Sequence, residues 1–139
     1  MSKVFLDTNV LVYSADRRDP VKQARAKQLL AGLQAGDPTP IISTQVLQEF
    51  YNALTHKLAV APALAVAELK VLAEVQTVLL TPIIIVDAAL PHGSASVSFW
   101  DALIVAAAQS AGCDEIWTED MQAGRMFGNL KVVNPFAGK

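Results

Sequence analysis

Short apolar runs alternate along this chain with longer stretches whose apolar residues recur at helical spacing. Residues 3–6 are an apolar run that ends at Asp7, which predicts a strand that feeds a polar turn. The same reasoning predicts further strands at residues 40–42, 77–80, 115–118 and 131–133.

Caps and prolines mark where the helices between these strands begin. Asp19-Pro20 places a capping residue before a proline at the first helical position, so a helix is predicted from there to about Ala35. Ser43 or Thr44 caps the next helix. Helices are predicted at residues 45–58, 62–74, 82–91 and 99–111, with a loop at 92–98 and a short helical stretch at 121–127. Strands that alternate with helices predict βαβ units, and therefore one α/β domain whose parallel sheet is covered on both faces.

Composition agrees with a single packed domain. The chain has 139 residues, of which 53% are hydrophobic and 17% charged, and this excludes a disordered chain. Apolar runs such as residues 83–86 and 102–108 are far shorter than the ~20 residues that a membrane span needs. Residues 1–15 lack the layout of a signal peptide. We therefore expect a soluble cytoplasmic protein that does not contact a membrane.

The scarcity of cysteine and histidine limits the metal chemistry available to the chain. Cys113 is the only cysteine, so a disulfide within the chain and a multi-cysteine zinc or iron–sulfur site are both excluded. His56 and His92 are too few for a histidine-rich site. Any bound metal would need carboxylate ligands, which suit hard cations such as Mg²⁺ or Mn²⁺.

The net charge of −2 gives no overall attraction to nucleic acid, but the positive charges are unevenly distributed. Five of the eleven cations gather in one segment: Arg17, Arg18, Lys22, Arg25 and Lys27. This cluster is either a solvated helix face or a rim that contacts phosphates beside an acidic centre.

Two acids are predicted to meet at one edge of the sheet. Asp7 follows the first strand, and Asp120 lies two residues beyond the strand that ends near Thr118. In open parallel sheets, ligands bind outside the carboxyl ends of the strands. Asp7 and Asp120 are therefore candidate ligands of one site, although they are far apart in the chain.

Each candidate acid also has an ordinary structural interpretation. Asp101 lies three residues after Ser98, as in a capping box, and a carboxylate suits that end of a helix. Glu49 could be an exposed residue at the border of an apolar helix face, and Asp120 could cap a helix that starts at Met121. Considered together, facing carboxylates repel one another unless a cation lies between them, which favours a site for a divalent metal.

Four stretches of the chain carry a family resemblance. They read Phe-Leu-Asp7-Thr8-Asn9, Ile-Ser-Thr-Gln-Val-Leu-Gln-Glu49-Phe, Ser-Phe-Trp-Asp101-Ala-Leu-Ile-Val-Ala-Ala-Ala and Ile-Trp-Thr118-Glu119-Asp120-Met-Gln. In order and spacing they resemble the acidic motifs of PIN domains, and the ending Val-Val-Asn134-Pro135-Phe136 is similar to that of prokaryotic members. The closest group is the VapC-like toxins of toxin–antitoxin pairs. The segment 90–94 departs from the longer helix typical of the family before the third motif.

The resemblance implies a fold, an activity and a site. The fold would be a three-layer α/β/α PIN domain over residues 1–139, with a short central parallel sheet. The activity would be that of an endoribonuclease that depends on Mg²⁺, with Mn²⁺ as an alternative. The implied metal ligands, which are also the catalytic residues, are Asp7, Glu49, Asp101 and Asp120. The residues implied to orient them are Thr8, Asn9, Thr118 and Glu119, although Glu119 could replace Asp120 as the fourth ligand.

The resemblance also implies partners: an RNA substrate, a cognate antitoxin and a second copy of the chain in a homodimer. The apolar faces of residues 46–58 and 62–75 are candidates for a dimer seam or an antitoxin groove.

Other classes of protein fit these residues less well. A phosphatase of the haloacid dehalogenase type needs an acid two residues after its nucleophilic aspartate, where this chain has Asn9. A phosphoreceiver domain needs a lysine that the segment 118–120 lacks. A PIN nuclease of RNA processing, and a PIN fold that serves only as an interaction platform, remain as alternatives.

Overall fold

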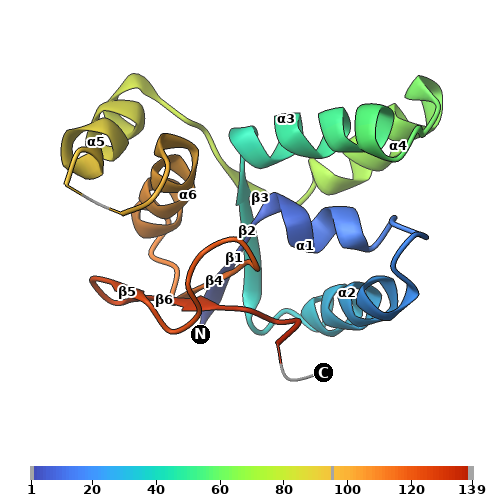
Figure 1. Cartoon of the computed structure of the whole chain (residues 1–139), viewed down its shortest axis with the longest axis horizontal. Helices are drawn as coiled ribbons and strands as arrows, with labels where there is room; N and C mark the ends of the chain where they lie inside the picture. The colour runs from blue at the N-terminus through green and yellow to red at the C-terminus, as the bar shows by residue number, and fades with distance from the viewer. Residues whose placement is uncertain (1, 95, 138–139) are drawn as a thin grey trace.

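A six-stranded sheet forms the centre of the chain, with the strands in the order β3-β2-β1-β4-β6-β5 (Figure 1). The computed structural model describes residues 2–94 and 96–137. The strands are β1 (Lys3–Leu6), β2 (Thr39–Ser43), β3 (Gln76–Val78), β4 (Glu115–Trp117), β5 (Met126–Phe127) and β6 (Leu130–Val133). All neighbouring strands are parallel except β5 and β6. The predicted parallel sheet is confirmed, with one antiparallel strand added at its edge.

Helices cover both faces of this sheet, as predicted. They are α1 (Thr8–Tyr13), α2 (Pro20–Leu33), α3 (Thr44–Asn52), η1 (Ala53–Lys57), α4 (Pro62–Leu72), α5 (Pro82–His92) and α6 (Phe99–Ser110). Figure 1 shows α1 to α4 on one side of the sheet and α5 and α6 on the other. Within residues 2–94 and 96–137, none of these helices is long and apolar enough to cross a membrane.

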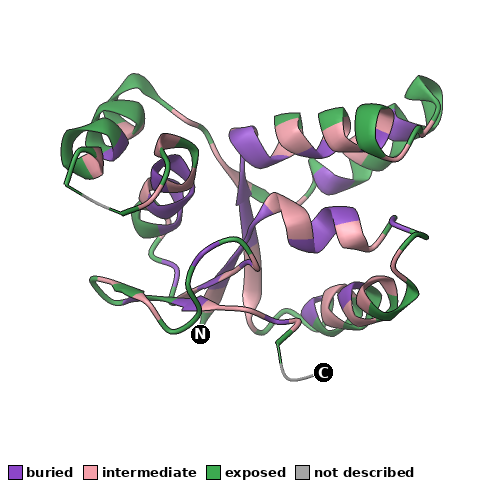
Figure 2. Cartoon of the chain, in the orientation of Figure 1, coloured by how far each residue is buried: buried purple, intermediate pink, exposed green. Residues whose placement is uncertain are grey.

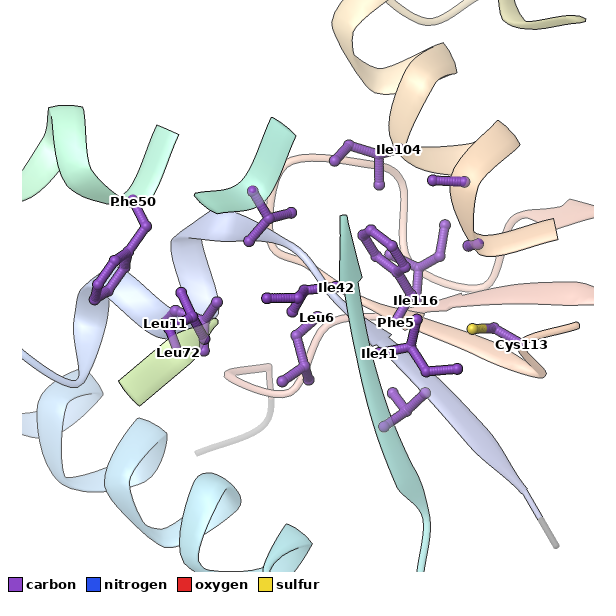
Figure 3. Packing of buried hydrophobic residues seen from close by; sticks show 14 of the residues in the cluster. Phe5, Leu6, Leu11, Ile41, Ile42, Phe50, Leu72, Ile104, Cys113 and Ile116 are labelled. Carbon is purple, nitrogen blue, oxygen red and sulfur yellow. The ribbon is translucent and has the colours of Figure 1, made fainter. Parts of the chain in front are cut away.

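The central strands are buried on both faces because both are packed against helices. Phe5 of β1 pairs with Ile41 of β2 and with Ile116 of β4, and all three side chains are fully buried. Figure 2 shows this burial along the strands, while α5 stays largely exposed. Figure 3 shows Leu11 and Phe50 on one side of the strands and other labelled core residues, Ile104 and Cys113, on the opposite side. The continuous hydrophobic core therefore holds the carboxyl ends of β1 and β4 in fixed positions.

Cys113 is a core residue. Its side chain is buried in the core, and burial raises the pKa of the thiol to about 11. A thiol with such a pKa is protonated near neutral pH and is a poor nucleophile.

Two predicted segments are wrong. The turn expected after Asp7 is the short helix α1, which Asp7 caps by accepting from the backbone N–H of Thr8. The helical stretch expected at 121–127 is absent; turns there lead into β5, which pairs with β6. Gly124 and Gly128 adopt positive φ angles of 86° and 63°, which glycine accommodates without strain and which end any regular helix.

Other boundaries shift by a few residues. β3 ends at Val78 rather than at Leu80, and α4 ends at Leu72 rather than at Glu74. The predicted helix 45–58 is regular only to Asn52 and continues as the wider turn η1.

Candidate active site

The candidate site lies where β1 and β4 end side by side. Asp7 follows β1 and its backbone N–H donates to the carbonyl of Trp117 at 3.1 Å, which extends the pairing by one residue. Thr118 follows β4 and is fully buried. Its hydroxyl donates to Asp7 Oδ2 at 2.8 Å. The structure thus joins the first and fourth motifs, as the sheet-edge argument predicted.

Asn9 links Asp7 to the loop that carries Asp120. Its Nδ2 lies 3.0 Å from Asp120 Oδ2, 3.1 Å from Thr118 Oγ1 and 3.4 Å from Asp7 Oδ2. Its Oδ1 accepts from the backbone N–H of Glu119 at 3.3 Å. One amide therefore sets the spacing between two candidate carboxylates.

Glu49 approaches from α3 and is held by two donors. The Thr8 hydroxyl donates to Glu49 Oε1 at 2.7 Å, and Gln45 Nε2 donates to Oε2 at 3.3 Å. The same Gln45 nitrogen lies 3.2 Å from the carbonyl oxygen of Trp100, the residue before Asp101. Glu49 is thus turned toward α1 and joined through Gln45 to the start of α6.

Asp101 lies in the first turn of α6. The Ser98 hydroxyl accepts from the Asp101 backbone N–H at 3.1 Å, so Ser98 is the helix cap. No bond returns from the Ser98 N–H to the Asp101 carboxylate within residues 2–94 and 96–137, so the reciprocal half of a capping box is not formed. The cap bond itself is made by the Asp101 backbone, and the Ser98 side chain also acts on the Asp101 carboxylate, where it opposes the rise in pKa caused by burial.

The carboxylates influence one another electrostatically. Burial is the main reason that the pKa of Asp7 rises to about 6, and the charges of Asp120 and Glu49 raise it further. Hydrogen bonds from Thr118 and from the Thr8 backbone act in the opposite direction. Burial likewise raises the pKa of Asp101, and the charges of Asp120 and Glu49 add to the effect. Asp7 and Asp101 are therefore each within electrostatic reach of Glu49 and Asp120.

Glu119 points away from this cluster. Its Oε1 accepts from the Tyr13 hydroxyl at 2.5 Å, and its Oε2 forms an ion pair with Lys22 Nζ at 2.7 Å. The Lys22 ammonium also lies over the Tyr13 ring, 4.8 Å from its centre. Both oxygens of Glu119 are thus occupied, whereas Asp120 accepts only from Asn9 among the described side chains.

The donor set fits a hard cation that keeps part of its water shell. In the part of the chain that the structure describes, no group of three or more His, Cys, Asp or Glu side chains is arranged so that it could hold a metal ion. Mg²⁺ rarely uses a complete cage of protein ligands; it is bound through one or two carboxylates and keeps several waters. Gln45 Oε1 is buried without a hydrogen-bond partner among the described residues, and a water bound to a cation could donate to it.

A cleft of about 270 Å³ opens beside these acids. Its lining residues are Thr8, Asn9, Val12, Tyr13, Asp16, Glu49, Ala53, Lys57, Glu119 and Asp120. Sequence reasoning missed Gln45 and Lys57. The spacing of Gln45 four residues before Glu49 was the available signal, because such residues share a helix face.

The basic residues of the segment 17–27 make different kinds of contact. Lys22 reaches the site through Glu119, while the Arg18 guanidinium binds both carboxylate oxygens of Asp16. Arg25 donates to the carbonyl of Pro135. Part of the cluster is therefore structural, and part borders the cleft.

Comparison with known proteins agrees with this arrangement. The PIN domain family profile matches residues 4–126. No curated protein matches the chain in sequence. Among solved structures, the chain is similar to VapC20 of Mycobacterium tuberculosis, described as a sarcin–ricin loop cleaving toxin, with 20% identity and a TM-score of 0.65 over 85% of this chain and 90% of that one.

Two further similar structures contain toxin–antitoxin pairs. One is a toxin–antitoxin complex from Klebsiella pneumoniae, with 22% identity and a TM-score of 0.68 over 96% of this chain and 98% of the other. The second is VapBC2 of Rickettsia felis bound to a DNA fragment from its promoter, with 18% identity and a TM-score of 0.66 over 93% and 96% of the two chains. At these identities the likeness establishes the fold.

Proposed function

The chain belongs to the PIN domain family, and on that premise we propose that it is a metal-dependent endoribonuclease and the toxin of a toxin–antitoxin pair. The observation that carries the proposal is the meeting of Asp7 and Asp120 at one sheet edge, where Asn9 Nδ2 lies 3.4 Å from Asp7 Oδ2 and 3.0 Å from Asp120 Oδ2. Burial and, after it, the charges of Asp120 and Glu49 raise the pKa of Asp7. Acids that disfavour one another's ionisation in this way are stabilised as anions by a cation between them.

The ion would be Mg²⁺, with Mn²⁺ as an alternative, and Asp7, Glu49, Asp101 and Asp120 would hold it, either directly or through its bound waters. When bound, it would help to deprotonate a water and stabilise charge on the leaving oxygen of an RNA phosphodiester. The chain itself orients the ligands. Asn9 and Thr118 hold Asp7 and the Asp120 loop, and Thr8 and Gln45 hold Glu49. Glu119 acts as a positioning residue, because Tyr13 and Lys22 bind both of its carboxylate oxygens.

The family assignment argues against a phosphatase of the haloacid dehalogenase type, and so does the residue at position 9. The position two residues after Asp7 would have to supply a proton, but the Asn9 amide is engaged in hydrogen bonds with Thr118, Asp120 and Glu119. An amide has no acidic proton to donate to a leaving group.

An antitoxin segment would bind the apolar groove between α2 and α4. Two adjoining pockets of about 290 and 560 Å³ lie there and share five lining residues: Ser14, Leu30, Gln34, Phe50 and Glu68. Leu64 and Val71 of α4 line this groove and are about two-thirds exposed. An amphipathic helix lays its apolar face into a groove of this kind. The location agrees with the apolar faces predicted at 46–58 and 62–75.

A homodimer would use a different surface. Ile83, Val86 and Leu90 form one exposed stripe along α5. A stripe of this spacing lies on one side of a helix and is unfavourable in water. Sedimentation of the wild type as a dimer and of Leu90→Asp as a folded monomer is the expected result.

The decisive experiment combines metal dependence with one isosteric substitution. Purified protein, freed of any bound partner, is incubated with total tRNA and mRNA in Mg²⁺, Mn²⁺ or EDTA. Asp101→Asn keeps the Ser98 cap, since the cap uses the backbone N–H. The matched control is Asp87→Asn, which removes one exposed charge on α5. Cleavage that needs the metal, is lost in Asp101→Asn and persists in Asp87→Asn supports the proposal.

Cleavage that is indifferent to EDTA or to Asp101→Asn would contradict it. The toxin role is tested separately by inducing the chain alone in a bacterial host. Growth arrest by the wild type, absent with Asp101→Asn, supports a toxin; unimpaired growth at equal protein level would favour an RNA-processing nuclease.

A further inference from the structure

We propose that Lys57 binds an RNA phosphate next to the one that is cleaved. The inference rests on the proposed nuclease function and assigns a substrate contact to the end of the cleft away from Asp120. Lys57 lines the same cleft as Glu49 and Asp120, although it lies outside every acidic motif.

A change of helical geometry aligns Lys57 with Glu49. Glu49, Ala53 and Lys57 all line the cleft at a spacing of four residues. In a regular α-helix, at 3.6 residues per turn, a residue eight positions on is rotated by about 80° from the first. From Ala53 onward the chain forms the wider turn η1, in which each residue turns by only about 80° instead of about 100°. The total from Glu49 to Lys57 is then close to two whole turns, so both side chains face the cleft.

Backbone hydrogen bonds maintain this wider turn. The N–H of Leu58 donates to the carbonyl of Ala53 at 3.1 Å, a separation of five residues. The N–H of Val60 donates to the carbonyl of Leu54 at 2.8 Å. Ala59, between them, has a φ of 53°, which an alanine adopts at a cost of about 1 kcal/mol. Wide turns of this kind are frequent at functional sites, and here the turn aims a cation into the cleft.

The ion pairs among the charged residues of the cleft do not involve Lys57, so its ammonium group can bind a phosphate. Five charged residues line the cleft: Asp16, Glu49, Lys57, Glu119 and Asp120. Asp16 is bound by Arg18, and Glu119 is bound by Lys22. These are the two ion pairs formed within residues 2–94 and 96–137, and neither includes Lys57.

This distribution divides the cleft into two parts. The acids Glu49 and Asp120 mark the end where the metal would bind. Elsewhere along the cleft, the charge of Lys57 acts on Asp16, but Arg18 forms the ion pair with Asp16, so Lys57 has no ion-pair partner among the described residues. Eight residues of helix separate Lys57 from Glu49 by roughly 10 Å along the axis. A cation at that distance meets a phosphate near the cleaved one rather than the cleaved one itself, and it would guide the RNA backbone across the acids.

RNA binding tests this directly. A fluorescein-labelled, mixed-sequence single-stranded RNA is titrated with protein in Mg²⁺ at several salt concentrations, with every protein carrying Asp101→Asn to slow cleavage. Lys57→Gln is expected to weaken binding about three- to tenfold. It should also reduce the slope of log K against log[salt] by about 0.7, the value for one phosphate contact on a single strand. Lys57→Arg should bind nearly as the parent does, and the control Lys70→Gln, which removes an exposed cation on α4, should leave the slope unchanged.

Kinetics provide a second readout. In the otherwise wild-type chain, Lys57→Gln should raise KM for the cleaved RNA and leave kcat within about twofold, because the contact is made before and during the reaction alike. If Lys57 only offsets the acids of the cleft, Lys57→Gln would tighten Mg²⁺ binding and leave the RNA salt slope unchanged; that result overturns the inference. RNA that neither binds to nor is cleaved by the wild type would instead overturn the proposed function, and this inference with it.

Discussion

The side-chain amide of Asn9 donates to the carboxylate of Asp120 at 3.0 Å, across 111 residues of sequence. The same nitrogen reaches Asp7, so a single amide aligns two acids that come from opposite ends of the chain. Without it, Asp120 would have no donor among the described residues. Asn9 is therefore central to the geometry of the proposed metal site.

Asn9→Ala is expected to lower Mg²⁺ or Mn²⁺ affinity by about 10- to 100-fold, the range for losing a group that orients metal ligands. Titration calorimetry measures this, and Asn52→Ala, which changes an exposed asparagine on α3, is the control. Unchanged affinity in Asn9→Ala would show that the acids are aligned by other means.

Asp120 and Glu119 are distinguished by what already binds them. Asp120→Asn should reduce metal affinity strongly, since it removes a proposed ligand. Glu119→Gln should retain most of the affinity, because Tyr13 and Lys22 occupy both of its oxygens. It should instead destabilise the fold by about 1 kcal/mol, since the ion pair with Lys22 is partly exposed. The opposite order of metal affinities would make Glu119 the fourth ligand.

Asp7 makes the stability of the metal-free protein depend on pH. Its pKa is about 6 in the folded chain and 3.8 as a free side chain. A raised carboxyl pKa means that the folded state holds the proton more tightly, so stability is greatest below about pH 4 and falls as pH rises toward 6. The two-unit difference corresponds to a loss of about 3 kcal/mol.

Urea unfolding in EDTA between pH 4 and 7.5 measures this loss, and Asp7→Asn should flatten the curve over that range. Adding Mg²⁺ should restore stability above pH 6, where Asp7 is ionised and able to bind it. A wild-type profile that coincides with that of Asp7→Asn would contradict the assignment.

Ile104 anchors α6, the helix that carries Asp101, because its side chain packs in the core between this helix and the sheet. Its side chain is fully buried, so Ile104→Ala should cost about 2–5 kcal/mol of unfolding free energy. Val21→Ala, at an exposed position of α2, should change stability by less than about 0.5 kcal/mol. Equal effects in urea unfolding would show that α6 is not anchored through this residue.

The main features of the fold follow from local patterns that the sequence displays. The strand before Asp7 and the proline-marked starts of α2, α4 and α5 were predictable because apolar runs and proline act over a few residues. Asp7 and Asp120 could be placed at one sheet edge because parallel strands align their carboxyl ends. Glu49 and Asp101 lie on helices and were assigned to the same site through the family resemblance.

What the sequence did not reveal depends on contacts between distant segments. The helix α1 has only six residues and forms because Asp7 caps it and the core accepts its apolar residues. The stretch 121–127 has helical composition but pairs with β6, a partner that a local pattern cannot show. The wide turn η1 changes which residues share a face, so a regular helical projection places Lys57 away from Glu49.

The position of β1 between β2 and β4 has a consequence for the time at which the site comes into being during synthesis. Asp7 leaves the ribosome early, yet its hydroxyl donor Thr118 lies 111 residues later. A nascent chain that stops before β4 lacks the strand that lies beside Asp7. It also lacks Thr118 and Asp120. Because these contacts join residues so far apart in the sequence, the proposed metal site can assemble only after β4 has been synthesised.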